Sequence, residues 1–418
     1  MKKQLCIAIL LLTAATFNAQ TLSKTEQQIV KNIDADMPAT IALLKVSVNI
    51  NSGIFNKEGV KEVGGLFTKE LAALGFTVEG IPMPDSVKRA GLLVAWRKGK
   101  KGKKLLLIGH LDTVFPEGTD VKVKREGTKL YGPGIGDDCR GLAVVLTVAK
   151  QVISAKVPFA GRLLIVGTVG EEGPGNLRGV RAIFRSPLKD SINVFLSIDG
   201  TGFGITNGGV GSNRYRVSYV GPGGHSYGAF GMPNPIHAMG RAIAKISELQ
   251  VPMTPKVTFN VGIVSGGTSV NSISASGVMD VDLRSESAAS LAVIDGALQT
   301  ALRRALDEER ARWPQSKVAL NMKIDTIGIR PAGTTPDTSF AVRTAQAAAT
   351  HMNLYAPLTI SSTDANIPMN LGIPALTLDG GGIGKGAHSL EEWYDDRTDG
   401  FKGPQWVMLV VLGLLGVK

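Results

Sequence analysis

The fold is decided by the stretch 163-LLIVGTVGEE-172, in which an uninterrupted apolar run ends in two adjacent carboxylates. A run that is apolar at every position is typical of a strand buried on both faces of a parallel sheet. Glu171 and Glu172 stand at the end of that strand, where two like charges in a crevice of low dielectric repel each other. The stretch therefore predicts a site in which something positive holds the two carboxylates.

Three further apolar runs each lead to acidic residues or histidines: Leu105–Ile108 to His110 and Asp112, Val194–Leu196 to Asp199, and Ala375–Leu378 to His388. Ligands of parallel sheets bind beyond the carboxyl ends of the strands, so we expect these side chains to lie close together. The helical spacing of Gly141 to Val152, between two of the runs, completes the alternation of strand and helix. The sequence therefore predicts an α/β domain built on a mostly parallel sheet.

Length and composition limit the class of protein. A chain of 418 residues with 44% hydrophobic residues can form two or three domains. Two N-terminal lysines, a short apolar stretch from Leu5 to Leu12 and a small residue at Ala19 predict a signal peptide over residues 1–19. We therefore expect an exported protein, periplasmic or secreted, whose only remaining cysteine is Cys139.

Two segments raise other possibilities. The net charge of +11 is partly due to the run 97-RKGKKGKK-104. No aromatic residue interleaves with this run, so we expect a solvated hairpin loop and no nucleic-acid partner. The apolar stretch from Trp406 to Val417 is too short to span a bilayer, so we expect a buried terminal helix and no stable membrane insertion.

The middle of the chain has a different pattern. Alternating and helical segments follow one another in the order β-α-β-β-α-β: Arg214–Val220, Pro235–Leu249, Val257–Val264, Gly277–Leu283, Ala288–Arg310 and Val318–Ile324. This is the order of a ferredoxin-like α+β unit. Because helix and apolar strand return after it, we predict that residues 212–326 are inserted into an α/β domain made of residues 20–211 and 327–418.

The polar residues at the strand ends have the chemistry of a metal site. Zinc favours His nitrogen and carboxylate oxygen, and a catalytic site leaves one position open for water. Two ions would be held by five side chains: His110, Asp137, Glu172, Asp199 and His388. Asp137 is the expected bridge, because the glycine-rich turn 131-YGPGIGDD-138 can bend tightly enough to aim it into the crevice. Asp112 is expected to accept the second imidazole N–H of His110 and fix its tautomer.

Each of these features alone has a purely structural explanation. A histidine at a strand end is often a hydrogen-bonded structural residue, and Asp-Asp in a glycine-rich turn is often turn chemistry. A Glu-Glu pair is often the solvated start of a helix. Five such features at matching strand ends are better explained together, and they favour a two-metal hydrolase.

With these motifs the chain resembles the M20 family of dimetal peptidases and amidohydrolases, from about residue 40 to the end. In the α/β part the resemblance rests on 109-GHLDTV-114, 134-GIGDD-138, 171-EE-172, 199-DG-200 and 387-AHS-389. In the inserted part it rests on 223-GGHS-226, 269-SVNS-272 and 282-DLRS-285, which match the family's lid and dimerisation domain. The expected fold is a zinc-exopeptidase-like domain with a ferredoxin-like lid.

The resemblance implies how the metals are held. His110 and Asp199 would bind one zinc and Glu172 and His388 the other, with Asp137 as the bridge and a cis bond between Asp137 and Asp138. Glu171 would be the general base that takes a proton from a water between the metals. Two Zn2+ ions are expected, and Co2+ or Mn2+ would suit the same ligands.

The resemblance also assigns residues of the lid. His225 would stabilise the oxyanion, in many members from the partner subunit of a homodimer, which we expect to form through the lid. Asn271 and Arg284 would grip a substrate carboxylate. The chain departs from the family at Cys139-Arg140, where many members have Lys-Gly, and we expect Cys139 to face away from the metals.

The resemblance further implies that the substrate is a short peptide or an N-acyl amino acid. Aspartate at position 199 accompanies di- and tripeptide aminopeptidases in the family, and we favour that activity. Residues 109–116 and 131–138 are more similar to the glutamate carboxypeptidase branch, so a carboxypeptidase or N-acyl-amino-acid amidohydrolase is the alternative. A non-catalytic binding or dimerisation module is a remote third interpretation, because Glu171 and all five ligands are present.

Overall fold

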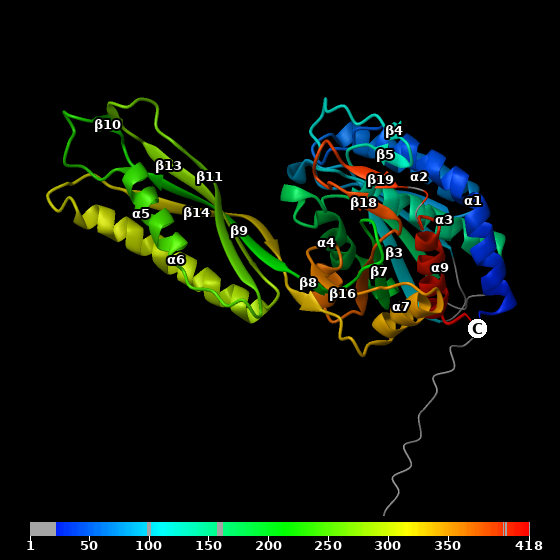
Figure 1. Ribbon diagram of the computed structural model, residues 1–418. Helices are drawn as coiled ribbons and strands as arrows, with labels where there is room; N and C mark the ends of the chain where they lie inside the picture. Colours follow the sequence, from blue (N-terminus) through cyan, green and yellow to red (C-terminus); the bar gives the residue numbers. More distant parts are fainter. Residues whose placement is uncertain (1–21, 98–101, 157–161, 396, 398, 418) are drawn as a thin grey trace, which may run out of the picture.

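The computed structural model describes residues 22–97, 102–156, 162–395, 397 and 399–417. These residues form two bodies, an α/β domain and an elongated domain inserted into it (Figure 1). The predicted signal peptide over residues 1–19 lies outside the described residues, as does part of the basic run that begins at Arg97. Within the described ranges, every helix is too short or too polar to cross a bilayer.

The α/β domain is built around one large sheet of strand order β1-β2-β6-β3-β7-β17-β8-β15, with β16 paired to β8. Its strands are β1 (Thr77–Ile81), β2 (Leu92–Arg97), β3 (Lys104–His110), β6 (Arg162–Thr168), β7 (Val194–Ile198), β8 (Ile205–Gly209), β15 (Gly333–Thr334), β16 (Leu358–Ser361) and β17 (Ala375–Leu378). The central strands β6, β3, β7 and β17 pair in parallel. Their side chains are buried on both faces, which confirms the predicted fold class.

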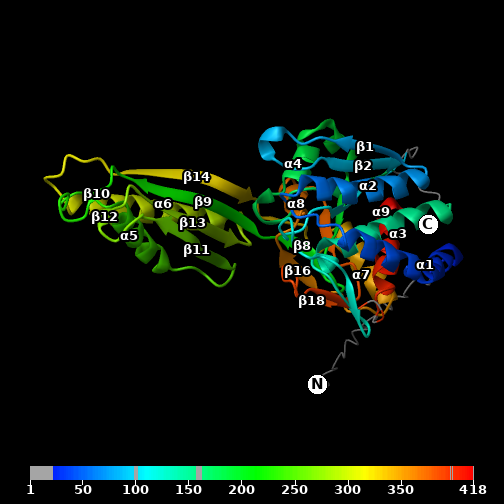
Figure 2. The ribbon, with the colours of Figure 1, turned by 90° about the horizontal axis from the view of Figure 1, so that it is seen from above.

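Helices cover this sheet and enclose the main core. They are α1 (Lys24–Val48), α2 (Lys57–Ala73), α3 (Arg140–Ser154), α4 (Arg178–Arg185), α7 (Phe340–His351), α8 (Asn366–Asn370) and α9 (Lys402–Leu415), with short helical turns η1 (Asp85–Val87), η2 (Ile135–Cys139), η3 (Gly173–Gly175) and η4 (Pro187–Ser191). Helices α3 and α9 contact β3, and α1 packs across both. Figure 2 shows α1, α2, α3 and α9 together on the side away from the inserted domain.

The structure tests two of the expectations from the sequence, the buried terminal helix and the hairpin after Arg97. Helix α9 is buried along its length, and its Trp406 Nε1 donates to the Ala345 carbonyl at 3.1 Å, so the predicted buried terminal helix is confirmed. The predicted hairpin between Arg97 and Lys104 is wrong. Strand β6 pairs with both β2 and β3 and lies between them, so β2 and β3 are not neighbours.

A second, small sheet of order β18-β19-β5-β4 lies beside the large one. Its strands are β4 (Lys124–Glu126), β5 (Lys129–Tyr131), β18 (Ile383–Lys385) and β19 (Trp393–Asp395). Strand β5 leads directly into the glycine-rich turn, and β18 and β19 flank the segment that carries His388. The small sheet therefore holds two candidate metal-binding segments next to each other.

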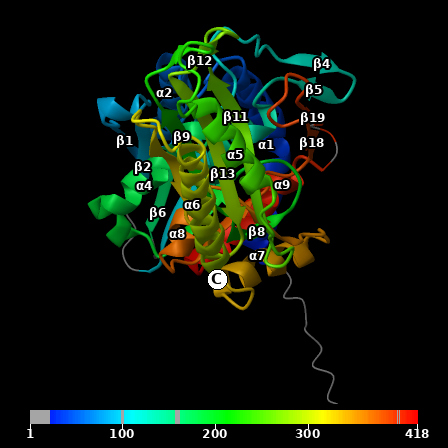
Figure 3. The same ribbon diagram turned by 90° about the vertical axis from the view of Figure 1, so that its left-hand side faces the viewer.

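The inserted domain has the predicted β-α-β-β-α-β order. Its elements are β9 (Gly211–Val220), α5 (Pro235–Ser247), β11 (Val257–Gly266), β13 (Ser276–Ser285), α6 (Ala288–Ala311) and β14 (Asn321–Arg330). The strands pair antiparallel in the order β11-β13-β9-β14, which is the ferredoxin-like arrangement. The domain has its own apolar core between the sheet and its helices. In Figure 3 it lies in front of the α/β domain.

Both ends of the inserted domain join the large sheet at one place. Strand β9 continues from β8, and β14 continues into β15, and β15 pairs with β8 through Gly333 and Gly209. Strand β14 runs to Arg330, beyond the end near Ile324 that the alternating pattern predicted. A register shift between Thr326 and Gly328 breaks the alternation, which is why the pattern ended early.

Candidate dinuclear metal centre

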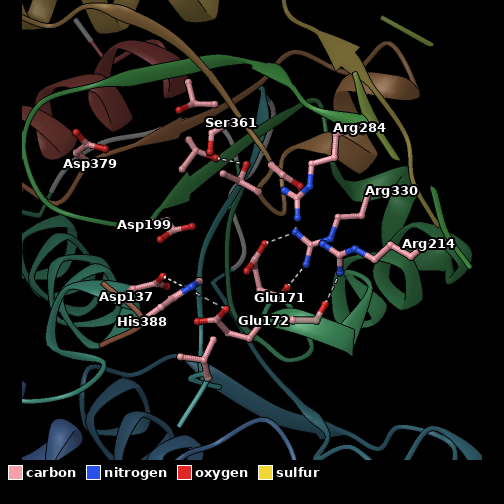
Figure 4. Close-up of a pocket in the computed structure, with 16 residues that line it drawn as sticks. Asp137, Glu171, Glu172, Asp199, Arg214, Arg284, Arg330, Ser361, Asp379 and His388 are labelled. Carbon is pink, nitrogen blue, oxygen red and sulfur yellow. Dashed lines mark hydrogen bonds and ion pairs between the residues drawn. The ribbon is translucent and has the colours of Figure 1, made fainter. Parts of the chain in front are cut away.

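The predicted ligands come together where the parallel strands end. His110 is the last residue of β3, Asp199 directly follows β7, and Glu171 and Glu172 follow β6 after a short turn. His388 comes from the segment between β18 and β19. Figure 4 shows Asp137, His388, Glu172 and Asp199 around one cleft, as the strand-end argument predicted.

The ligand atoms form two groups that share one carboxylate. One group is His110, Asp137 and Asp199, and the other is Asp137, Glu172 and His388. The Nε2 atoms of His110 and His388 each lie 3.0 Å from a different oxygen of Asp137, Oδ1 and Oδ2 respectively. His388 Nε2 is also 3.4 Å from Glu172 Oε2. This division is the one that the resemblance implied, with Asp137 between the two groups.

The buried polar atoms of these groups fit metal ions. His110 Nε2 and Glu172 Oε1 are buried but lack a hydrogen-bond partner among the described residues. His110 Nε2 is close to Asp137 without hydrogen-bond geometry, as expected for two atoms that face a common ion. An unpaired buried polar atom is costly, and a bound ion would remove that cost. Imidazole nitrogen and carboxylate oxygen are ligands that zinc favours.

The charges of the site lead to the same conclusion. Burial raises the pKa of Glu172 to about 7. Burial, together with the negative charges of Asp137 and Asp138, raises the pKa of Asp199 well above its ordinary value. Hydrogen bonds to Asp137 and Glu172 raise the pKa of His388 to about 10. Carboxylates crowded in this way repel one another, and a bound cation would relieve the repulsion.

The glycine-rich turn is held by a residue that the sequence did not single out. The carboxylate of Glu392 accepts the backbone N–H groups of Gly134 at 2.8 Å, Gly136 at 2.7 Å and Asp137 at 3.2 Å. The Asp137–Asp138 bond is cis, as the resemblance implied. Glu392 lies four residues after His388, but only the folded small sheet shows that it fixes the turn that carries Asp137.

The expected role of the Asp112 side chain is corrected by the structure. The atom 2.8 Å from His110 Nδ1 is the backbone carbonyl oxygen of Asp112, and its carboxylate points elsewhere. That carboxylate accepts the backbone N–H groups of Gly170 at 2.8 Å and Glu172 at 3.3 Å. The chain turns directly after β3, which brings the carbonyl and not the side chain to the ring. Asp112 thus orients His110 through its main chain and the Glu171-Glu172 turn through its carboxylate.

The predicted base, Glu171, is paired with a buried arginine from the end of β14. Arg330 is 5% exposed, and its Nη1 donates to Glu171 Oε1 at 3.0 Å and to Ser362 Oγ at 3.1 Å. Its Nη2 also donates to the Glu171 carbonyl oxygen. The guanidinium therefore fixes both the backbone and one carboxylate oxygen of Glu171. Nothing in the sequence pattern marked Arg330, because its partner lies on a different domain.

Two more arginines line the same cleft, which has a volume of about 490 Å³. We call Arg214, Arg284 and Arg330 the arginine wall; all three lie on one side of the cleft in Figure 4. The Nε atoms of Arg214 and Arg284 donate to the two oxygens of Asp282, at 2.9 Å and 2.6 Å. Arg214 Nη1 also donates to the Gly173 carbonyl at 2.8 Å. Two cations share one carboxylate here, so the wall has positive charge in excess.

The other two predicted lid residues do not reach this cleft within one chain. His225 and Asn271 lie at the far end of the inserted domain, where β10 (Gly224–His225) pairs with β12 (Ser272–Ile273) (Figure 1). Arg284 lies at the opposite end of the domain, so it is separated from Asn271. The N–H groups of Tyr227 and Gly228 both donate to His225 Nδ1, at 3.3 Å each. The exposed imidazole therefore has its other nitrogen, Nε2, available as a donor.

Cys139 is directed away from the candidate metals. It packs in a small apolar cluster with Leu44, Val48 and Tyr394. Burial raises the pKa of its thiol to about 12, which disfavours the thiolate that binds metals. This agrees with the expected orientation of Cys139, and neither ligand group contains it.

Two ligand groups that share a carboxylate at the ends of a parallel sheet are the arrangement of a dinuclear metallohydrolase. The family model described as Peptidase family M20/M25/M40 matches residues 106–408, so the chain belongs to that family. It is therefore a hydrolase of the peptidase and amidohydrolase class.

Three relatives show the extent of the similarity. Carboxypeptidase G2 of Pseudomonas sp. (strain RS-16) is 30% identical over 296 residues, or 66% of this chain and 67% of the relative. The aminopeptidase PepT from Bacillus cereus ATCC 10987 has the same fold, with a TM-score of 0.71 and 18% identity over 90% of this chain and 98% of that one. The YXEP protein of Bacillus subtilis, a dinuclear metal-binding peptidase from the M20 family, aligns with a TM-score of 0.63 and 14% identity over 92% and 100%.

Proposed function

We propose that the protein is a dinuclear zinc peptidase that hydrolyses an amide bond of short peptides, with di- or tripeptide aminopeptidase as the favoured activity. The observation that carries the proposal is the pair of ligand groups that share Asp137, with Glu171 in the same cleft. A binding module without catalysis would have no need of a carboxylate poised beside an intact set of ligands.

The residues of the cleft divide the chemistry among them. The ions would be held by His110, Asp137, Glu172, Asp199 and His388, and zinc there would polarise the scissile carbonyl and acidify water. Arg330 occupies Oε1 of Glu171, which leaves Oε2 to accept a proton from the attacking water and deliver it to the leaving amine. His225 Nε2 would donate to the carbonyl oxygen as negative charge develops on it.

The arginine wall supports a substrate with a free carboxylate. The Nε of Arg284 is held by Asp282, and its Nη atoms have no hydrogen-bond partner among the described residues. The planar guanidinium can therefore bind a carboxylate through two parallel hydrogen bonds. In a short peptide whose scissile bond is near the N-terminus, the C-terminal carboxylate belongs to the leaving fragment and would bind there.

A carboxypeptidase or N-acyl-amino-acid amidohydrolase is the second candidate. It is favoured by the likeness to carboxypeptidase G2 and by the same Arg284, because these substrates also carry a terminal carboxylate. The presence of aspartate at position 199 favours the aminopeptidase.

The two activities can be separated with zinc-loaded protein and a panel of tripeptides with free or blocked N-termini, with the products identified by mass spectrometry. Release of the N-terminal residue from unblocked peptides only would support the aminopeptidase. Release of the C-terminal residue from blocked peptides would establish the second candidate. The panel also includes N-acetyl amino acids, and cleavage of none of its members would favour the non-catalytic interpretation.

We also propose a homodimer formed through the inserted domain. Strand β11 is at the edge of its sheet, and its side chains Ile263 and Val264 are 60% and 56% exposed. An exposed apolar edge strand offers free N–H and C=O groups to a second strand. A partner subunit would then supply His225 and Asn271 to a cleft that they do not reach in their own chain. Light scattering of the wild type and of an Ile263→Lys variant would test this arrangement.

We further propose that residues 1–19 direct export to the periplasm or the medium. The support is the order of charge, short apolar stretch and small residue at the N-terminus. N-terminal sequencing of the protein recovered from each cellular fraction would test it, since removal after Ala19 is the expected result.

A further inference from the structure

One carboxylate in the cleft has no part in the proposed mechanism. Asp379 directly follows β17 and lines the same cleft as the ligands and the arginine wall. In Figure 4 the ligand Asp199 lies between Asp379 on one side and the arginine wall on the other. The cleft therefore has a negative group at one end, the ligands in its middle and excess positive charge at the other end.

Main-chain hydrogen bonds fix Asp379 relative to Asp199. The N–H of Asp199 donates to the Leu378 carbonyl at 3.0 Å, and the N–H of Asp379 donates to the Gly204 carbonyl at 3.2 Å. The N–H groups of Gly380 and Gly381 donate to the carbonyls of Gly200 and Gly202, each at 2.9 Å. The segments that carry Asp199 and Asp379 thus form one rigid unit, so the position of the carboxylate is not set by a mobile loop.

Glycines leave space around the carboxylate. A Cβ atom at Gly202 or Gly204 would lie 2.9 Å or 3.0 Å from Asp379 Oδ2, and one at Gly200 would lie 3.8 Å from Oδ1. The Gly204 N–H donates to Oδ2 at 2.6 Å, which leaves Oδ1 available. A side chain at these positions would crowd the carboxylate, so glycine there keeps a small opening beside it.

Asp379 has no cationic partner in the described part of the chain. This distinguishes it from Asp137, Glu171 and Asp282, each of which contacts a histidine or an arginine. Burial raises the pKa of Asp379 to about 7, as expected for a carboxyl group without a compensating charge. A small cationic hydrogen-bond donor is the group that would complement it.

We infer that Asp379 binds the protonated α-amine of the N-terminal residue of the substrate, which rests on the proposed function. The Asp379 end of the cleft then receives the ammonium group, and the arginine wall receives the carboxylate of the leaving fragment. The substrate class is a zwitterionic short peptide whose scissile carbonyl lies at the ligands between the two charges. An N-acyl amino acid has no ammonium group to offer Asp379, so this subsite would select against it.

Two substrates that differ only by the amine test the inference. Alanyl-alanine and propionyl-alanine contain the same amide bond and release the same alanine, but only the first has an α-ammonium group. The variant is Asp379→Asn, which keeps the size and the acceptor for the Gly204 N–H but removes the charge. The control is Asp337→Asn, because Asp337 is exposed and outside the cleft.

With zinc-loaded protein, the wild type and Asp337→Asn should prefer alanyl-alanine. In Asp379→Asn, kcat/KM for alanyl-alanine should fall about 10- to 100-fold, the effect of one lost hydrogen bond between charged groups, with propionyl-alanine unchanged. Since both substrates use the same chemistry, a general loss of folding or metal would lower both alike.

The other outcomes separate the subsite from the proposed function. Equal use of both substrates by the wild type, or an unchanged preference in Asp379→Asn, would overturn the amine subsite and leave the hydrolase standing. An equal fall for both substrates in Asp379→Asn would also overturn it. The same pair is also made one residue longer, as alanyl-alanyl-alanine and propionyl-alanyl-alanine, and hydrolysis of none of the four substrates by the wild type would overturn the short-peptide function and the subsite together.

Discussion

The ligands of the α/β domain and the polar residues of the inserted domain differ in how their positions are determined. His110 and Glu172 are buried at strand ends and are held by several hydrogen bonds from neighbouring turns. His225 and Asn271 are exposed at a distant two-strand ribbon of the inserted domain. The difference teaches that one chain brings both candidate ligand groups together, whereas the oxyanion and carboxylate contacts proposed for this ribbon would require a second subunit.

The largest loss of activity should come from a change at Glu171, beside the ligand groups of the α/β domain. Glu171→Gln removes the proton acceptor but keeps the shape and hydrogen bonds with Arg330, so kcat should fall about 10²- to 10⁴-fold. Metal content, measured by elemental analysis, should stay the same as in the wild type. Glu117→Gln, at an exposed position, is the control. Retained activity in Glu171→Gln would refute its assignment as the base.

Removal of a ligand should reduce metal content as well as activity. His388→Ala deletes the imidazole that lies 3.0 Å from Asp137 and 3.4 Å from Glu172, so the ion of that group should be lost. His351→Ala, on α7, replaces a histidine outside both groups and should keep the full metal content. Two ions per chain in purified His388→Ala would contradict the ligand assignment.

A mixing experiment tests whether His225 of one subunit acts in the cleft of the other. His225→Ala should lower kcat about 10²- to 10³-fold, the usual cost of one lost oxyanion donor. Mixed with Glu171→Gln under conditions of subunit exchange, it should regain activity, because a mixed dimer has one site with an intact Glu171 and the partner's intact histidine. Half of the dimers are mixed and half of their sites are intact, so about a quarter of wild-type activity should return.

If the mixture of the two variants stays inactive although subunit exchange is demonstrated, His225 acts in its own chain or not at all. The contrast between a self-sufficient metal centre and a shared lid would then be wrong.

A smaller effect is expected at Arg284, the lid residue that already lines the cleft of its own chain. Arg284→Ala should raise KM about 10- to 100-fold for peptides with a free C-terminal carboxylate, because a charged, two-pronged contact is lost. Peptides with an amidated C-terminus should be little affected, and initial-rate kinetics on matched pairs would show the difference. An equal rise in KM for both kinds of peptide would count against a carboxylate contact.

The smallest effect concerns stability. Burial raises the pKa of Asp379 to about 7 in the folded protein from an ordinary 3.8, so its contribution to stability is present at low pH and is lost as the pH rises through 7. Asparagine does not ionise, so Asp379→Asn should gain stability relative to the wild type between pH 5 and pH 8, by about 2–3 kcal/mol. Thermal unfolding of metal-free protein at both pH values would measure this. A difference that does not grow with pH would argue against a buried, uncompensated carboxylate.

The sequence predicted those parts of the molecule that depend on local pattern. Apolar runs identify β3, β6, β7 and β17, and a parallel sheet forces their ends together, so the pattern alone could place His110, Glu172 and Asp199 in one site. The inserted domain was predicted from its order of alternating and helical segments. The exact end of β14 was not, because a register shift interrupts the alternation on which the prediction depends.

What the sequence did not predict depends on contacts between distant segments. Arg330 reaches Glu171 across 159 residues, and Glu392 reaches Gly134 across 258. A buried arginine or glutamate has no signature in a single sequence, because its partner is chosen by the topology. Asp112 shows that the sequence can predict which residue lies beside another without predicting which of its atoms makes the contact. Its position near His110 was anticipated, but whether the carbonyl or the carboxylate faces the ring depends on the backbone direction of one turn.

Strands β8 and β15, which connect the two domains, show how one domain can be inserted into another without disturbing its sheet. The inserted domain leaves the sheet after Gly209 and returns at Gly333, and these two residues are paired to each other. A short turn could therefore close the gap if the residues between them were absent, and the core strands β6, β3, β7 and β17 would keep their order. The insertion therefore joins the α/β domain at one edge of the large sheet, where a change in its length would leave the strands that carry the candidate ligands in place.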